Sequence, residues 1–445
     1  MRNHATLSTE LRTGLSSLLL LLVLLLPGCP SSKQPRSWQG SDHAKVVRYT
    51  YAGLRIAQRI EPRPYAHIEV LFAKPDHESE ALTKALLQTI LLGGSESQPG
   101  AAFVSALERA GALVDVQFRP THAALRLRCL PAHMPDAFDA LTGLLAKPLL
   151  PEDQFGYQCD LARRQLAASS ATPAAQANAQ LQAALYADDV APSLDWDQDD
   201  ADYARHQYIP LSLLVKCRVA ITTVGPVDAE QLGDRLFNTL DQLPDGECVP
   251  PAVRTPRWGQ IHATHVTGGE QHISAAFPGP PAGHPDAVPL AAAMDLLQAW
   301  MQQRLVISQR LLTTAEARYL PGMAGQPGQV SLELGGPRPL QAAELVLSEI
   351  RTLKAEGMRP SRLDSARAWL AVEGGLAMES APAIAEQMGT ALFTDGWSNF
   401  GNPEARVAAL KPAHIQLVLN KYCTQVCWGF AGDTLRLDRK TLLRL

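Results

Sequence analysis

The sequence lacks the short histidine motifs that hold zinc in hydrolytic enzymes. Its 12 histidines form neither His-x-x-Glu-His nor His-Glu-x-x-His anywhere in the 445 residues. The closest pair is His262 and His265, and their spacing within an apparent strand would place the two rings on opposite faces of a sheet. We therefore expect no metal site and no bound cofactor.

Charged residues are also scarce. They make up 19% of the chain, and the formal net charge is −4. Lysine and arginine do not gather into a basic stripe, so we expect no nucleic-acid partner. Hydrophobic residues make up 46% of the 445 residues, which is enough to bury the cores of two or three domains.

A long hydrophobic run occurs at the N-terminus. Arg2 and Arg12 precede an apolar stretch, Leu15 to Leu26, of about a dozen residues, which is short for a membrane span and typical of a signal peptide. We expect residues 1–28 to be this signal peptide. The mature protein would then act outside the cytoplasm.

The run ends in Leu26-Pro27-Gly28-Cys29, which resembles a bacterial lipobox. In that resemblance Cys29 carries the lipid, and residues 29–45, rich in polar residues and proline, form a tether. Pro30 rather than aspartate follows the cysteine, which favours the outer membrane, facing the periplasm. We expect a bacterial envelope protein held at the membrane by its lipid alone; an ordinary signal peptide cleaved nearby is the alternative.

Apart from Cys29, the chain has few cysteines. An oxidising compartment would allow some of them to pair, although spacing does not reveal the connectivity. Cys423 and Cys427 fall within what reads as one strand, too far apart to bond to each other. We interpret most of the six as small buried hydrophobes: Cys129, Cys159, Cys217, Cys248, Cys423 and Cys427.

The two halves of the chain repeat one pattern at a nearly constant offset. Phe72 and Phe277 each end an apolar strand pattern (277 − 72 = 205), and Pro131 and Pro337 each lead into a helix pattern (337 − 131 = 206). The matched segments are strands 66–72 and 272–277, helices 81–92 and 289–306, strands 123–129 and 329–334, helices 134–146 and 340–356, and closing strands 213–225 and 425–432.

This duplication predicts an α+β fold with two homologous halves. Strand and helix patterns come in blocks, which indicates a mostly antiparallel sheet in each half with helices packed on one face. We expect an N-terminal half at 46–250 and a C-terminal half at 257–445. The proline-rich segment Pro250–Pro256 would be the linker between them.

A duplicated half with this element order resembles the insulinase/pitrilysin family, which includes the mitochondrial processing peptidase and its bacterial relatives. The resemblance runs from about Val46 to the C-terminus. It implies that the two halves face each other across a cavity. Its local marks are Gly53-Leu-Arg-Ile-Ala, the Leu91-Leu-Gly-Gly turn, Glu108-Arg-Ala-Gly-Ala-Leu-Val114 and Pro148-Leu-Leu-Pro-Glu-Asp153.

Active members of this family carry the inverted zinc motif His-x-x-Glu-His on the first helix of the first half. Aligned by the Leu-Gly-Gly turn, the two histidine positions fall on Lys84 and Gln88, and the general-base position falls on Leu87. The resemblance places the distal ligand on Gln165 and a supporting acidic position on Gln158.

None of these side chains supports zinc chemistry. A protonated lysine repels a cation, amides are poor zinc ligands, and leucine cannot accept a proton. The resemblance therefore implies a non-catalytic member of the family.

A substrate-binding pair is the one functional feature of the family that this chain keeps in part. Active members place an arginine and a tyrosine against the substrate backbone, after a segment that Gln303-Arg304-Leu305 matches. On this chain these positions are Arg310 and Tyr319, nine residues apart where the family has about seven. Both side chains can donate hydrogen bonds to a peptide carbonyl. The alternative is a solvated helix residue and a core tyrosine.

Three functions remain open at this point. The first is the substrate-binding subunit of a heterodimer, in which a zinc-bearing homologous subunit supplies the metal and this chain binds a peptide or unfolded polypeptide. The second is a solitary peptide-binding or scaffold lipoprotein, as a monomer or homodimer. The third is a metalloendopeptidase of unexpected mechanism, for which the sequence offers no nucleophile and base.

Overall fold

We describe the fold from a computed structural model of the chain. The expected signal peptide, Cys29, the tether, Cys217 and Cys248 lie outside the described residues. None of the described helices is long and apolar enough to cross a bilayer. All described residues belong to one compact unit, His43–Leu445. The structure describes residues 46–51, 54–73, 80–119, 121–186, 218–227, 255–322, 326–394, 396–400 and 407–444.

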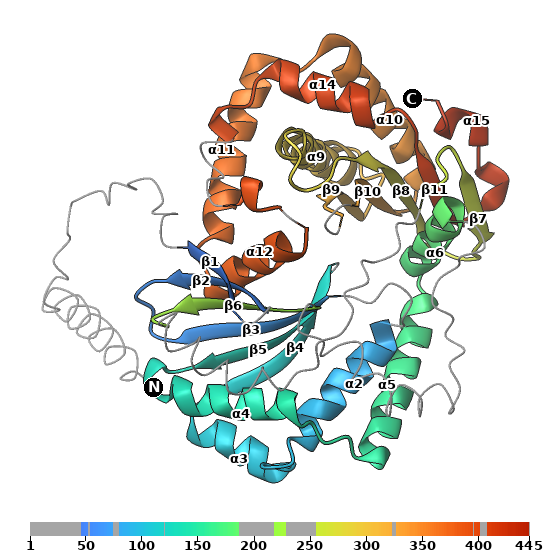
Figure 1. Cartoon of the computed structure of the whole chain (residues 1–445). Coiled ribbons are helices and arrows are strands. Elements are labelled where there is room, and N and C mark those ends of the chain that lie inside the picture. The colour runs from blue at the N-terminus through green and yellow to red at the C-terminus, as the bar shows by residue number, and fades with distance from the viewer. Residues whose placement is uncertain are drawn as a thin grey trace, which may run out of the picture. The chain divides into compact units, whose positions relative to one another are not determined.

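The first half forms a six-stranded sheet (Figure 1). Its spatial order is β1-β2-β6-β3-β5-β4, and neighbours are antiparallel except β2 and β6. The central strand β3 is buried along nearly its whole length because helices cover it from both sides. The strands are β1 (Val46–Tyr51), β2 (Leu54–Ile60), β3 (Ala66–Ala73), β4 (Leu113–Phe118), β5 (His122–Cys129) and β6 (Val219–Gly225).

Helices from the first half cover one face of this sheet. Alternate residues Ile68, Val70 and Phe72 of β3 point into this layer, as the period of two in a strand requires. Their side chains join a core with the apolar faces of the helices. These helices are α2 (Glu80–Gly93), α3 (Ala101–Arg109), α4 (Met134–Ala146) and α5 (Glu152–Ser170), with the 3₁₀ turn η2 (Pro131–His133) before α4.

The second half forms a five-stranded sheet in the order β7-β11-β8-β10-β9. The pair β7 and β11 is parallel and the other neighbours are antiparallel. The strands are β7 (Ile261–His265), β8 (Gln271–Gly279), β9 (Thr314–Leu320), β10 (Gly328–Gly336) and β11 (Cys427–Gly432).

The two sheets share one topology. If β1 is set aside, the first sheet runs β2-β6-β3-β5-β4, and each strand has its counterpart, in the same chain order, in β7-β11-β8-β10-β9. The parallel pair also falls at the same place in both sheets. The predicted α+β fold with two homologous halves is therefore confirmed. The exact boundaries 46–250 and 257–445 stay a prediction.

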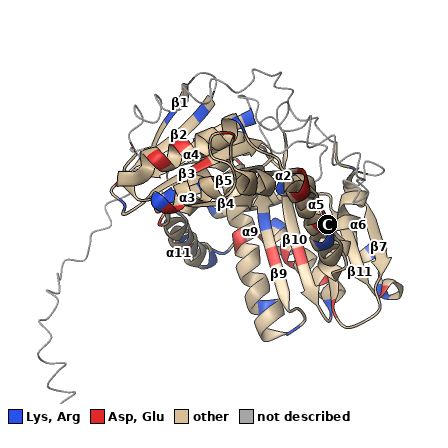
Figure 2. Ribbon diagram, turned by 90° about the horizontal axis from the view of Figure 1, so that it is seen from below, with Lys and Arg blue, Asp and Glu red and all other residues tan. Residues whose placement is uncertain are grey.

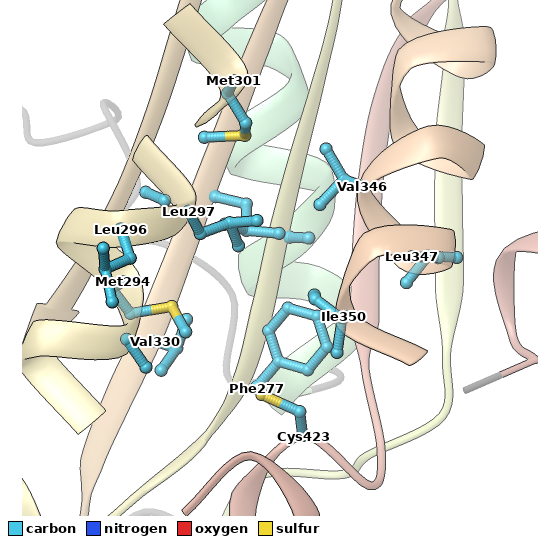
Figure 3. Packing of buried hydrophobic residues seen from close by; sticks show 14 of the residues in the cluster. Phe277, Met294, Leu296, Leu297, Met301, Val330, Val346, Leu347, Ile350 and Cys423 are labelled. Carbon is cyan, nitrogen blue, oxygen red and sulfur yellow. The ribbon is translucent and has the colours of Figure 1, made fainter. Parts of the chain in front are cut away.

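The second sheet has its own helical layer and its own core. Figure 3 shows Phe277 from β8 packed among Met294, Leu297 and Ile350 from the helices. The helices and turns of this half are α9 (Ala287–Met301), the π-helical turn η5 (Gln302–Ser308), α10 (Pro339–Glu356), α11 (Pro360–Ala377), η6 (Gly396–Asn399), α14 (Pro412–Tyr422), η7 (Thr434–Arg436) and α15 (Arg439–Leu442).

Each sheet also receives one helix from the other half on its second face (Figure 1). Helix α6 (Pro173–Tyr186) leaves the first half and packs on β7, β8 and β11, and α12 (Ala381–Thr394) leaves the second half and packs on β2, β3 and β6. The two helices are themselves repeat equivalents (381 − 173 = 208). Helices thus lie on both faces of each sheet, where the sequence predicted one.

The described cysteines are free thiols. Cys129, Cys159, Cys423 and Cys427 are all buried and unpaired. The expectation that Cys423 lies in a strand is wrong, because α14 continues to Tyr422 and Cys423 caps it. The strand begins at Cys427. Burial raises the pKa of the Cys423 thiol to about 12, so this side chain behaves as a small hydrophobe.

Charged residues of both signs are interspersed over the described elements (Figure 2). On β9 and β10, for example, Arg318 lies 2.9 Å from Glu316 and 3.9 Å from Glu333. Such exposed pairs contribute little to stability.

Candidate functional site

Helix α2 presents the degenerate motif at the surface of the first half. Leu86, Leu87 and Ile90 share the apolar face that packs into the core, whereas Lys84 and Gln88 are only half-buried. A spacing of four residues places Lys84 and Gln88 one above the other on the same side of the helix.

The end of α2 is fixed by the Gly93-Gly94 turn that served to align the motif. Gly94 has φ of +71°, and an added Cβ would lie 2.3 Å from the carbonyl oxygen of Gln98. The carbonyl of Gly94 accepts a hydrogen bond from the backbone N–H of Leu149 (2.9 Å), just before α5. This turn therefore holds α2 and the start of α5 in a fixed relation.

Helix α5 brings the expected distal position to α2. The Lys84 ammonium donates a hydrogen bond to Oε1 of Gln165 (3.2 Å), although the two residues are 81 positions apart. Gln158, two turns earlier on α5, is buried at 7% exposure. The structure thus brings together the positions that sequence comparison assigned to two zinc ligands.

Leu87, at the expected general-base position, is fully buried in the core of the first half. Its side chain does not reach the surface on which Lys84 and Gln88 lie. The site therefore offers a cation and amide groups, and no group that could activate water. Among the residues that the structure describes, no three His, Cys, Asp or Glu side chains gather closely enough to hold a metal ion.

Arg310 lies in the connection between the π-helical turn η5 and β9, and not within a helix. It is exposed, and its φ of +50° is the only positive value at a residue other than glycine in the described chain. An arginine gains nothing sterically from this conformation, which glycine adopts at lower cost. Strained residues of this kind cluster at functional sites.

Tyr319 lies near the far end of β9. Its hydroxyl donates a hydrogen bond to the carbonyl oxygen of Pro280 (2.6 Å), and burial raises its pKa. Tyr319 lies five residues beyond Thr314, the first residue of β9, a span of roughly 17 Å along the strand. The structure therefore does not bring Arg310 and Tyr319 together at one point, and their contact with substrate stays a prediction.

A buried polar network lies where α12 covers the first sheet. Arg119, just after β4, donates to both carboxylate oxygens of Glu69 on β3 (2.6 and 2.9 Å). His67 lies 3.0 Å from the same carboxylate, and His122 lies 3.1 Å from Arg119. Glu386 of α12 approaches Arg119 from the other side at 3.6 Å.

The network fixes the charge of its members. Burial alone would raise the pKa of Glu69, but hydrogen bonds from His67 and Arg119 and the charge of Arg119 lower it to about 2. Burial, and then the charge of Arg119, lowers the pKa of His122 to about 3. Glu69 is therefore ionised at neutral pH and His122 is neutral.

Sequence reasoning did not identify this network. A signal was present, because His67 and Glu69 alternate with apolar residues in the strand Ala66–Ala73 and so share one face. Arg119 and Glu386 gave no comparable signal, since each reads as an ordinary charged residue.

One family model matches the sequence. Residues 216–370, from just before β6 into α11, match the model described as Peptidase M16 inactive domain. A comparison with curated proteins gave no match. The matched range lies mostly in the second half and does not include the degenerate zinc motif. That the first half lacks zinc ligands is therefore inferred from its own side chains, Lys84, Leu87, Gln88 and Gln165.

Solved structures share the fold over most of the chain. A protease from Helicobacter pylori (15% identity, TM-score 0.75) covers 87% of this chain and 99% of its own. A peptidase M16 inactive domain from Pseudomonas fluorescens (16%, 0.76) covers 87% and 98%. The periplasmic protease PqqL from Escherichia coli (13%, 0.68) covers 87% of this chain, which spans 45% of PqqL.

Proposed function

Because the chain is a non-catalytic homologue of the insulinase-type (M16) peptidases, we propose that it is the substrate-binding partner of a zinc-bearing relative in the bacterial cell envelope. One observation carries the proposal. Lys84 and Gln165, which align with two zinc-ligand positions of active relatives, lie in hydrogen-bond contact, and neither side chain is a zinc ligand. A chain that keeps the peptidase fold without the zinc ligands is consistent with a subunit that binds the substrate while a second subunit cleaves it.

A free sheet edge in the first half supports peptide binding. Strand β4 is an edge strand, and no hydrogen bond from the described residues reaches its outer backbone groups. The equivalent edge strand β9 is covered, because Gln298 and Gln302 both donate to the carbonyl of Ala315 (2.9 and 2.8 Å). An extended peptide can therefore add to β4 as a further strand and is blocked at β9.

The envelope location is supported by the N-terminal signals and by the periplasmic protease PqqL of Escherichia coli, which has a similar fold. Cys29→Ser should release the protein from membranes into the soluble envelope fraction, because one lipid-bearing residue is the proposed anchor. Cell fractionation with immunoblotting measures this. If the variant still sediments with membranes, the lipobox assignment is wrong.

Arg310 is the residue that would complete a partner's site. Its strained φ of +50° and exposed side chain suit a donor held ready for a substrate carbonyl. Co-expressed with a zinc-bearing relative from the same genome, the wild-type chain should support peptide cleavage that neither chain gives alone. Arg310→Ala should lower kcat/KM by about 10²-fold, the scale seen for loss of one oxyanion-type donor.

Three control variants distinguish a direct contact of Arg310 with substrate from an effect of the substitution on folding. Arg359→Ala removes another exposed arginine and should leave cleavage unchanged. Arg310→Gly should lose activity like Arg310→Ala, yet unfold at equal or higher urea concentration because glycine relieves the positive φ. Arg310→Lys keeps the charge without the guanidinium fork and should give an intermediate rate. Full cleavage with Arg310→Ala would exclude the proposed role.

The alternative is a solitary peptide-binding lipoprotein. The free edge of β4 favours it as well, because peptide binding there needs no second subunit. Peptide binding by the chain alone, together with failure of every zinc-bearing relative to give cleavage in the co-expression experiment, would support the alternative. A metalloendopeptidase function has no support in the side chains at the site.

A further inference from the structure

A cavity of about 650 Å³ opens between α9, α11 and α12. Small residues leave it open, including Ala291 on α9, Gly374 on α11, and Ala383 and Ala391 on α12. Its volume falls within the usual range of sites for organic ligands. Most of the lining is apolar, and the wall also carries Tyr319.

The charged groups on the cavity wall are acidic. Asp295 and Glu386 line it, and its described lining contains no Lys, Arg or His. The Glu386 side chain is 53% exposed, and its ion-pair partner among the described residues is Nε of Arg119 at 3.6 Å. Arg119 already neutralises Glu69 through two hydrogen bonds. The carboxylate of Glu386 therefore remains able to attract a second cation.

One arginine side chain links the cavity wall to the end of the edge strand β4. Arg119 follows β4 directly, since the strand ends at Phe118, and the same arginine contacts Glu386 on the cavity wall. Strands in a sheet are about 4.8 Å apart, so a few residues of extended chain can reach from β4 across its neighbours. A polypeptide that pairs with β4 and continues past the end of the strand at Phe118 could therefore reach the cavity wall with its next residues.

We propose that this cavity receives one bulky apolar side chain of a bound polypeptide, and that Glu386 binds a lysine or arginine next to it. The proposal rests on the peptide-binding function inferred above and names its substrate class. An apolar wall and an acidic mouth complement an apolar residue followed by a basic one.

Fluorescence anisotropy with the purified Cys29→Ser chain tests the proposal. The probes are three fluorescein-labelled octapeptides of Gly and Ser with a central Phe-Arg, Phe-norleucine or Gly-Arg pair. We expect Phe-Arg to bind most tightly, Gly-Arg at least about tenfold more weakly, and Phe-norleucine about fivefold more weakly. Equal Kd values for the three probes would overturn the proposal.

Variants locate the site. Ala291→Trp fills the cavity and should weaken Phe-Arg binding at least about tenfold. Ala368→Trp, at an exposed position of α11 outside the cavity, should not. Ala383→Leu provides a second cavity-filling change if Ala291→Trp fails to fold. Binding that is unaffected by either cavity variant would overturn the proposal.

Charge variants test whether Glu386 binds the arginine of the peptide. Glu386→Gln should lower affinity for Phe-Arg to that of Phe-norleucine and leave Phe-norleucine unchanged. Glu344→Gln, an exposed acid on α10, should change neither. An equal loss for both probes on Glu386→Gln would contradict a direct contact with the arginine.

The outcomes also separate this inference from the proposed function. If the chain supports cleavage by a partner but the cavity variants bind all probes normally, this inference fails and the proposed function stands. If dodecylammonium binds the cavity and the peptides do not, the occupant is a lipid-like amphiphile and the inference is wrong. If no probe binds and no partner gives cleavage, the proposed function fails too.

Discussion

The variant Lys84→His/Gln88→His/Gln165→Glu is expected to hold one zinc ion per chain after dialysis, and the wild type well under one. Lys84 and Gln88 lie four residues apart on one side of α2, and Gln165 already lies 3.2 Å from the tip of Lys84. Two imidazoles and a carboxylate in this arrangement form a three-ligand zinc site. Elemental analysis gives the stoichiometry, and calorimetry the affinity.

Two controls test the geometry of this zinc site. Lys84→His/Gln88→His retains two ligands and should bind zinc at least about tenfold more weakly. Lys84→His/Gln88→His/Arg164→Glu moves the carboxylate by one residue, about 100° around α5, and should behave like the two-ligand variant. Stoichiometric zinc in the dialysed wild type, or equal affinity for the two triple variants, would show that the aligned positions are not those of the metal site.

Restored zinc is not expected to restore hydrolysis. Leu87 occupies the general-base position and is fully buried among apolar side chains. A glutamate there would either remain protonated or strain the core, since an ionised carboxylate without partners is costly to bury. The packing around Leu87 therefore opposes hydrolysis independently of the missing zinc ligands.

Sequence patterns predicted the duplicated sheets because strand periodicity and proline positions are local signals. They did not predict that α6 and α12 cross to the opposite half. An apolar helix face shows that a helix is buried, but not which of two equivalent sheets buries it. Both helices occupy the same place in the repeat, so the apolar pattern of each helix is satisfied equally well by packing on the sheet of its own half or on that of the other half.

Part of the candidate site could likewise be predicted from the sequence, and part could not. Alignment through the Leu-Gly-Gly turn assigned Lys84 and Gln165 to one site, and their side chains are hydrogen-bonded in a fold where that turn fixes α2 relative to α5. The sequence spacing of Arg310 and Tyr319 did not reveal how far apart the two side chains lie. Positive φ at Arg310 and the extended course of β9 set these residues apart, and neither feature can be read from residue types alone.

Removing the carboxylate of the buried network is expected to cost more stability than any surface change. Glu69→Leu leaves the Arg119 guanidinium buried, and among the described residues its remaining carboxylate partner is the more distant Glu386. Loss of one partner of a buried pair costs about 3–5 kcal/mol. Glu316→Gln, which removes one of the two exposed carboxylate partners of Arg318, should cost at most about 1 kcal/mol. Urea unfolding measures both.

The double variant and acid titration identify the cause. Glu69→Leu/Arg119→Met should recover much of the lost stability, because it removes the uncompensated charge. The pKa of Glu69 is lowered from 4.5 to about 2, so its stabilisation is present above pH 4.5 and is lost as the pH falls towards 2. The pKa of His122 is lowered from 6.5 to about 3, so acidification below pH 6.5 already favours the unfolded state, which takes up a proton there. Wild-type stability should therefore fall in two stages on acidification, and Glu69→Leu should lack the lower stage. A single acid transition that is identical in both proteins would show that Glu69 does not stabilise the fold through its charge.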